Sequence, residues 1–209
     1  MMNRVLKEVN SSINGKVVVM KTLGLGTYLQ VDGLTQSGGV VSTVWKQTLR
    51  KVKRQKKDIQ KVLILGLGGG SAVKLVKKYF PFAIITGVEI DPVMVDLGCE
   101  YLNLDRKEIK IIIDDAYKVV EKLEKRKRHF DLIIVDMYIG YEVPEKFEKT
   151  PFLKRIKKLL RKSGIVIFNR LYFAENRSKA IHFAEKLDKV YSSVDYIYPE
   201  ANVMLVCKA

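Results

Sequence analysis

Residues 61–71 read KVLILGLGGGS. Positions 62–65 form an unbroken apolar run, which is typical of a strand buried on both faces of a sheet. The glycines that follow allow a tight turn and let a ligand approach the backbone, and a helical pattern begins directly after them. The unpaired N–H groups at the start of that helix add to the binding capacity of the turn. This strand–turn–helix unit predicts a ligand site at the carboxyl end of a buried strand.

The rest of the chain repeats this alternation. The sequence predicts strands at residues 62–65, 83–88, 109–113, 132–135 and 165–168, separated by helices at 72–79, from 92 onward, and at 116–127, 147–161 and 178–190. Two further strands, 194–198 and 203–207, are joined by a turn. Such alternation requires right-handed crossovers and a mostly parallel sheet covered on both faces. We therefore predict an α/β, Rossmann-like fold with a seven-stranded, mostly parallel sheet whose last strand is antiparallel.

The first 60 residues follow a different pattern. Short β-branched runs at 16–22 and 27–32 predict a β-hairpin. Ser42 or Thr43 is a suitable cap for a helix that starts near Val44, and basic residues recur along that helix at helical spacing. We therefore divide the chain into an N-terminal hairpin and basic helix, residues 1–60, and a Rossmann-like domain, residues 61–209.

Carboxylates end the next three predicted strands. Glu89 ends the second strand, 19 residues after Gly70, where an acidic side chain commonly binds the two hydroxyls of a ribose. Asp114 and Asp115 end the third strand, and Asp136 ends the fourth. Because the carboxyl ends of parallel strands share one edge of the sheet, these groups predict a nucleoside-like ligand across that edge.

The order of these motifs resembles that of the class I S-adenosylmethionine-dependent methyltransferases. More narrowly, the chain is similar to the spermidine synthase family, which shares that fold. Three segments carry the narrower resemblance: LQVDGLTQ at 29–36, VLILG at 62–66 and FDLIIVD at 130–136. The resemblance covers nearly the whole chain.

The resemblance implies a cofactor and a set of residues that bind it. The cofactor would be S-adenosylmethionine, or decarboxylated S-adenosylmethionine in a polyamine-making member. Glu89 would hold the ribose hydroxyls and Asp115 with Ala116 would meet the adenine. Gln36 and Gly66 would lie near the methionine end. Gly68 and Gly70 complete the expected cofactor-binding set.

Three departures from the polyamine-making members affect the acceptor side. Those members carry a carboxylate inside the Gly-rich turn, where this chain has Gly69, and a second Asp after the fourth strand, where it has Ile139. They also carry an acid after the first-helix aromatic, whereas Trp45 is followed by Lys46 and Gln47. A polyamine is a multiply charged cation whose site needs carboxylates. The acids that remain nearby are those of the following loop, Glu142, Glu145 and Glu148.

Three functions stay open at this point. We favour methyl transfer to an unidentified acceptor, with Asp136 as the catalytic residue and Tyr138 and Tyr141 near the acceptor. The first alternative is aminopropyl transfer at an altered amine site. The second is a non-catalytic protein that binds the cofactor or nucleic acid.

The charge of the chain points to its partners. Lys and Arg total 38 against 23 Asp and Glu, a net charge of +15, and residues 1–60 hold 11 basic and 3 acidic residues. A nucleic acid or an acidic protein fits such a field, and so does a lysine-rich surface that only maintains solubility. Combined with the missing carboxylates, this excess argues against a cationic substrate.

Other features limit the location and the chemistry. No apolar run approaches the roughly 18 residues of a membrane span, so we expect no membrane contact. Two cysteines without a CxxC motif predict a reducing, cytoplasmic location and two core side chains rather than nucleophiles. His129 and His182 are far apart, so no metal site is predicted. By resemblance to the family, a homodimer formed through the N-terminal region is expected.

Overall fold

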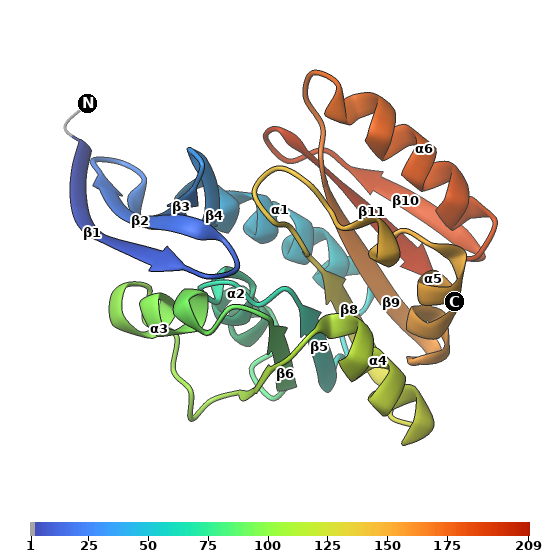
Figure 1. The fold of residues 1–209 in the computed structure, drawn as a ribbon. Coiled ribbons are helices and arrows are strands. Elements are labelled where there is room, and N and C mark those ends of the chain that lie inside the picture. The colour runs from blue at the N-terminus through green and yellow to red at the C-terminus, as the bar shows by residue number, and fades with distance from the viewer. Residues whose placement is uncertain (1–2) are drawn as a thin grey trace.

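The computed structural model describes residues 3–209 and contains the predicted sheet (Figure 1). Its seven strands have the order β10-β11-β9-β8-β5-β6-β7. All neighbours are parallel except β11, which is antiparallel to both β10 and β9. The strands are β5 (Lys61–Leu65), β6 (Ile84–Glu89), β7 (Lys110–Ile113), β8 (Phe130–Val135), β9 (Leu160–Leu171), β10 (Ser193–Ile197) and β11 (Asn202–Lys208). The predicted fold class is therefore confirmed.

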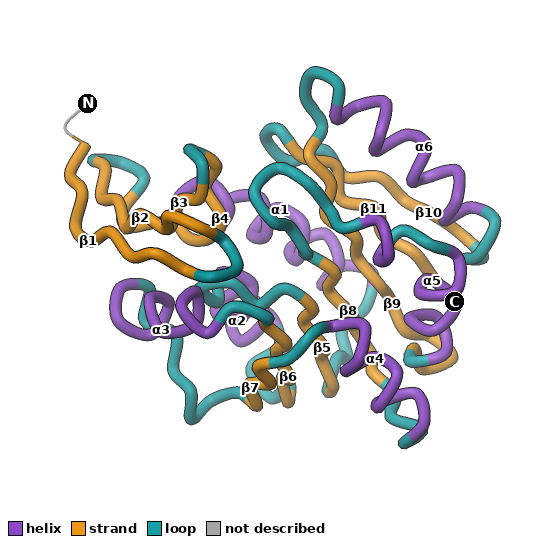
Figure 2. The backbone as a smooth tube through the Cα atoms, viewed as in Figure 1, coloured by secondary structure: helices purple, strands orange, loops and turns teal. Residues whose placement is uncertain are grey.

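Helices cover both faces of this sheet because its central strands are apolar on both sides (Figure 2). Side chains of one face, such as Val62, Ile64 and Leu132, share a core with α1 and α2. Those of the other face, such as Leu63 and Ile133, share a core with α4, α5 and α6. The first layer holds α1 (Gly39–Gln55) and α2 (Ser71–Tyr79), and the second holds α4 (Ala116–Lys125), α5 (Thr150–Lys158) and α6 (Asn176–Asp188).

The first helix starts earlier than the sequence indicated. α1 begins at Gly39, and its N-cap residue, Gly38, makes no side-chain capping bond, so neither Ser42 nor Thr43 is the cap. Gly38 has a φ of 77°, and its N–H donates to the Ser71 hydroxyl 2.7 Å away. A tertiary contact to α2 thus determines the start of α1. The basic residues of α1 are exposed except Lys53, which is partly buried.

The boundary between α5 and β9 also differs from the prediction. α5 ends at Lys158 rather than continuing to Arg161, and β9 begins at Leu160. Arg161 donates to both oxygens of the buried Asp131 at 2.9 and 3.0 Å, and Leu160 pairs with Phe130. Cross-strand pairing and this ion pair therefore outweigh the helical pattern of the segment.

The N-terminal unit is a four-stranded antiparallel sheet rather than a lone hairpin. The predicted hairpin corresponds to β2 (Gly15–Thr22) and β3 (Gly26–Val31), and it is flanked by β1 (Asn3–Ser11) and β4 (Leu34–Gly38). Apolar side chains of β2 and β3 pack against Met94 and Leu97 of α3 (Pro92–Tyr101). The predicted boundary between residues 60 and 61 stays a prediction, although α1 packs into the same core as β5 and α2.

The two cysteines lie within the packed interior, as expected. Cys207 is fully buried in β11, and burial raises the pKa of its thiol well above the usual range, while Cys99 is partly buried on α3. Across residues 3–209, no helix is both long enough and apolar enough to cross a membrane. The same residues contain no cluster of three side chains that would hold a metal ion.

The carboxyl ends of the three central strands are tied together by backbone bonds. Gly66 and Leu67 both donate their N–H to the carbonyl of Val88 at 3.0 Å, and Asp136 N–H donates to the carbonyl of Leu65 at 2.8 Å. Gly66 has a φ of 82°, and a Cβ there would overlap the carbonyl oxygen of Asp136. Glycine at position 66 thus allows β5 and β8 to end side by side.

Replacement of Gly66 by Ala is expected to destabilise the fold by about 3–5 kcal/mol, since backbone strain at positive φ adds to the steric overlap. Urea denaturation measures this loss. Gly15→Ala is the matched control, because Gly15 also has positive φ but open space around its Cβ position. It should cost about 1 kcal/mol. Equal losses for the two variants would contradict the close approach of β5 and β8.

Candidate active site

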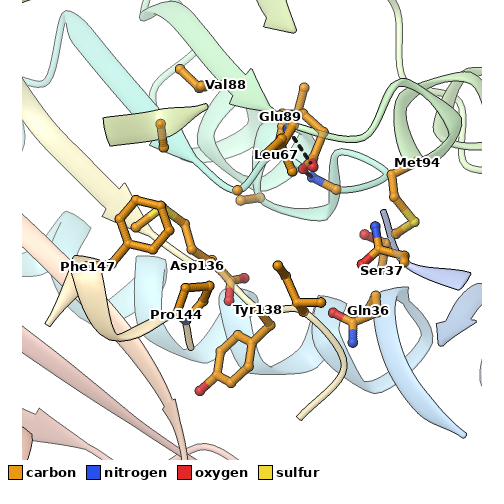
Figure 3. A pocket seen from close by; sticks show the side chains of 18 of the residues that line it. Gln36, Ser37, Leu67, Val88, Glu89, Met94, Asp136, Tyr138, Pro144 and Phe147 are labelled. Atoms are coloured by element: carbon orange, nitrogen blue, oxygen red, sulfur yellow. Dashed lines mark hydrogen bonds between the residues drawn. The ribbon is translucent and has the colours of Figure 1, made fainter. Parts of the chain in front are cut away.

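A cavity of about 210 Å³ lies at the carboxyl edge of the sheet (Figure 3). It brings together most of the residues selected from the sequence, namely Gln36, Gly66, Gly68, Glu89, Asp115, Ala116, Asp136 and Tyr138. Gly70 and Tyr141 are not among the residues that line it. In Figure 3, Glu89 lies on one side of the cavity, and Gln36 and Tyr138 lie on the other.

Glu89 is held rigidly at the end of β6. One carboxylate oxygen accepts the Gly68 N–H at 2.7 Å, and the other accepts the N–H groups of Ile90 and Asp91 at 2.8 and 3.0 Å. Burial nevertheless raises the pKa of Glu89, because it disfavours the charged form, and these three bonds only partly oppose that effect. The side chain is thus a fixed acceptor at the cavity wall, which suits the hydroxyls of a ribose.

The Gly-rich turn has separate roles for its glycines. Gly68 faces the cavity, whereas Gly70 adopts a left-handed conformation and caps α2 away from it. Gly69 donates its N–H to the Ser37 hydroxyl at 2.7 Å, and a Cβ there would come within 2.8 Å of Leu102 and 3.0 Å of Leu29. A side chain at position 69 would therefore require the ends of Leu102 and Leu29 to shift.

The loop after β7 also contributes to the lining of the cavity. Asp115 caps α4 by accepting the Tyr117 N–H at 2.7 Å, and its second oxygen pairs with the ammonium of Lys146. Lys146 comes from the loop after β8 and also lines the cavity. Asp91 likewise caps α3 by accepting the Val93 N–H. Asp115 and Ala116 thus both line the cavity, and their contact with an adenine stays a prediction.

Both oxygens of the Asp136 carboxylate accept hydrogen bonds from side chains. One oxygen accepts the indole N–H of Trp45 at 3.1 Å, and the other accepts the amide of Asn169 at 2.8 Å. Asn202 in turn donates to the Asn169 side-chain oxygen at 2.8 Å, which directs the Asn169 NH₂ toward Asp136. Burial raises the pKa of Asp136, while the bonds from Asn169 and Trp45 and the nearby charge of Arg170 oppose the rise.

The sequence did not reveal the supporting roles of Trp45, Asn169 and Asn202. Asn169 lies at the carboxyl end of β9, so the rule that selected the strand-end carboxylates would have found it if amides had been included. Asn202 begins the antiparallel strand β11. Only the insertion of β11 beside β9 brings it to the site.

The two candidate acceptor tyrosines occupy different environments. The Tyr138 hydroxyl accepts the Leu171 N–H at 2.8 Å, and burial raises the pKa of Tyr138 to about 12. Tyr141 is exposed and lines a second cavity of about 310 Å³, which Tyr138 borders as well. Tyr138 therefore separates the two cavities, and Tyr141 belongs to the outer one.

A model of the spermine/spermidine synthase domain matches residues 45–201. The chain belongs to this family. It is 32% identical over 161 residues to a Drosophila melanogaster protein named eEF1A lysine and N-terminal methyltransferase homolog, covering 73% of this chain but only 24% of that protein. The chain thus spans about a quarter of that relative's length.

Two solved structures share the fold. Spermidine synthase from Thermotoga maritima is 18% identical, with a TM-score of 0.81, covering 98% of this chain and 72% of that one. Human methyltransferase-like protein 13 is 22% identical, with a TM-score of 0.66, covering 81% of each chain. The predicted resemblance to the spermidine synthase family is confirmed by the family match and these likenesses.

We use the name acceptor wall for the part of the cavity around Asp136, where the sequence predicts the acceptor. This part of the lining carries one carboxylate, Asp136 itself. Trp45, Tyr138, Ile139 and Pro144 line the cavity around Asp136. The acids of the following loop are not part of that lining. They pair with cations instead, Glu142 with Lys179, Glu145 with Lys149 and Glu148 with Arg170. The loop itself is held over the cavity by a bond of 3.1 Å from Gln36 to the carbonyl of Gly140.

The role of Glu89 is tested by binding of S-adenosylmethionine to Glu89→Ala in a calorimeter. Loss of hydrogen bonds to a charged acceptor is expected to weaken binding about ten- to a hundredfold. Because the pKa of Glu89 is raised, the wild-type affinity should fall with decreasing pH before the ordinary glutamate pKa of about 4.3 is reached. Glu89→Gln should show no such fall. Unchanged affinity of Glu89→Ala for S-adenosylmethionine would show that Glu89 does not bind the cofactor.

Asn169→Ala is expected to raise the pKa of Asp136 further, because it removes an N–H that stabilises the carboxylate. A ¹³C NMR titration of labelled Asp carboxyl groups measures this. Asn202→Ala should raise the pKa of Asp136 less. The Asn169 amide that donates to Asp136 remains, and it loses only the hydrogen bond that orients it. An Asp136 titration that is the same in all three proteins would contradict the network.

Proposed function

We propose that this protein is an S-adenosylmethionine-dependent methyltransferase that acts on an amine nitrogen. The observation that carries the proposal is the composition of the acceptor wall, where Asp136 is the one carboxylate among aromatic and aliphatic side chains. The cationic substrate that the sequence disfavours is therefore a polyamine, which needs several carboxylates along its length, whereas a single amine needs one acceptor. Position 139, an isoleucine, lines the cavity where polyamine-making members carry an Asp.

The residues of the cavity fit the cofactor. Glu89 presents fixed acceptor oxygens for two ribose hydroxyls, and Leu67, Val88 and Met94 supply an apolar surface beside it. Gly66 and Gly68 leave the backbone open to close approach. S-adenosylmethionine supplies a methyl group on a positively charged sulfur, which makes that carbon electrophilic.

The chain's own residues would align the acceptor and receive its proton. Asp136 is held through both oxygens, so its remaining lone pairs keep a fixed direction toward the cavity. Its raised pKa suits a group that takes a proton from an ammonium and leaves the neutral amine. Trp45 and Tyr138 flank this position with aromatic surface, which favours a cationic group and excludes water.

The similarities support this assignment. The Drosophila relative bears a methyltransferase name that specifies lysine and N-terminal amines, and human methyltransferase-like protein 13 was solved in complex with SAH. The likeness to spermidine synthase over 98% of the chain favours aminopropyl transfer as the second candidate. The two unpaired cysteines fit the reducing conditions of a cytoplasmic location, which we also propose.

Product analysis separates the candidates. The protein is incubated with S-adenosylmethionine or its decarboxylated form and with lysine-rich protein, peptides or polyamines. Methyl transfer yields S-adenosylhomocysteine and a methylated amine, and aminopropyl transfer yields methylthioadenosine. We expect the former, with Asp136→Asn at least about 100-fold slower. Methylthioadenosine as the only product would refute the assignment, and neither product despite tight cofactor binding would favour the non-catalytic alternative.

A substitution at position 139 adds a second test. Ile139→Asp restores a carboxylate on the acceptor wall, so it should strengthen binding of spermidine in a calorimeter. Ile181→Asp, on the exposed side of α6, is the control because Ile181 is about half exposed and lies outside both cavities. Equal spermidine binding by wild type, variant and control would show that position 139 does not govern amine selectivity.

A further inference from the structure

Residues 46–88 concentrate positive charge on one side of the molecule. They contain 11 basic residues and a single acidic one, Asp58. The remainder of the chain has 27 basic and 22 acidic residues, so most of the net charge of +15 comes from this segment. The basic residues are Lys46, Arg50, Lys51, Lys53, Arg54, Lys56, Lys57, Lys61, Lys74, Lys77 and Lys78.

These cations are not neutralised by the protein itself. Within residues 3–209, every ion pair joins residues outside the segment 46–88. A lysine-rich surface that serves only solubility intersperses charges of both signs, as the rest of this molecule does. The segment departs from that pattern, which indicates an anionic partner.

The two helices that carry most of these cations lie next to each other. α1 and α2 pack side by side in the same layer, and the ammonium of Lys53 lies 4.8 Å from the centre of the Phe80 ring just after α2. Lys46, Arg50 and Arg54 follow one another at intervals of four residues, or about 6 Å along α1. Phe82, two residues beyond Phe80, is 93% exposed. An exposed aromatic ring thus follows α2 in the turn before β6, three residues beyond the last residue of the helix.

We propose that the exposed face of α1 and α2 binds the phosphate backbone of a single-stranded nucleic acid, with Phe82 stacking on a base. Lys is depleted in protein–protein interfaces, whereas Lys and Arg supply most contacts to phosphate, so a nucleic acid fits better than an acidic protein. Aromatic platforms beside basic grooves are the usual means of binding unpaired strands. The face lies outside the cavity, so this surface does not depend on the proposed methyl transfer.

Fluorescence anisotropy with labelled 20-nucleotide oligo(U) and oligo(dT) tests the proposal. Arg50→Gln with Arg54→Gln is expected to weaken binding about 25-fold at 0.1 M salt and to lower the slope of log affinity against log salt by about 1.4. Phe82→Ala should weaken binding of the single strands at least fivefold and leave binding of a duplex unchanged. Tighter binding of oligo(U) would identify the partner as RNA, and tighter binding of oligo(dT) would identify it as DNA.

The matched control is Lys186→Gln with Lys189→Gln, since both lysines are exposed near the end of α6, on the opposite face of the sheet. This control should bind like the wild type. Equal weakening in the control and the Arg50/Arg54 variant would show a general charge effect and overturn the proposal. Binding of polyglutamate in preference to both oligonucleotides would overturn it in favour of an acidic protein.

Discussion

The side-by-side ending of β5 and β8 at Gly66 is the constraint on which the site depends. The glycine lets the carbonyl of Asp136 approach the turn after β5, and the Asp136 N–H continues the ladder to Leu65. This contact brings the Gly-rich turn next to the carboxylate of Asp136. Because the Gly66 N–H also donates to the carbonyl of Val88, Glu89 is brought to the same place. One backbone arrangement thus assembles both ends of the cavity.

The two carboxylates of the cavity share burial but differ in support. Glu89 is held by backbone N–H groups alone, which belong to the turn and to the start of the next loop. Asp136 is held by side chains from three different elements, α1, β9 and, through Asn169, β11. The first arrangement depends on the local turn, whereas the second depends on how the whole sheet and α1 pack. Changes to acceptor chemistry are therefore possible without disturbing the nucleoside end.

The sequence predicted the parts of the molecule that local pattern controls. The buried strands, the Gly-rich turn, Glu89 and Asp136 follow from periodicity and from the rule that strand ends share an edge. The start of α1 and the end of α5 did not follow, because a bond from Gly38 to Ser71 and the pair between Arg161 and Asp131 determine them. β1 was missed because most of its side chains are polar or exposed. Trp45, Asn169 and Asn202 were missed as site residues because only tertiary packing joins them.

The central claim is that a nucleoside lies across the carboxyl edge of the sheet with its reactive end at Asp136. A crystal structure with bound S-adenosylhomocysteine tests it most directly. We expect ribose hydroxyls within hydrogen-bond distance of Glu89 and the sulfur facing the space between Trp45, Tyr138 and Asp136. A nucleoside bound in the outer cavity beside Tyr141, or one whose ribose makes no contact with Glu89, would contradict it.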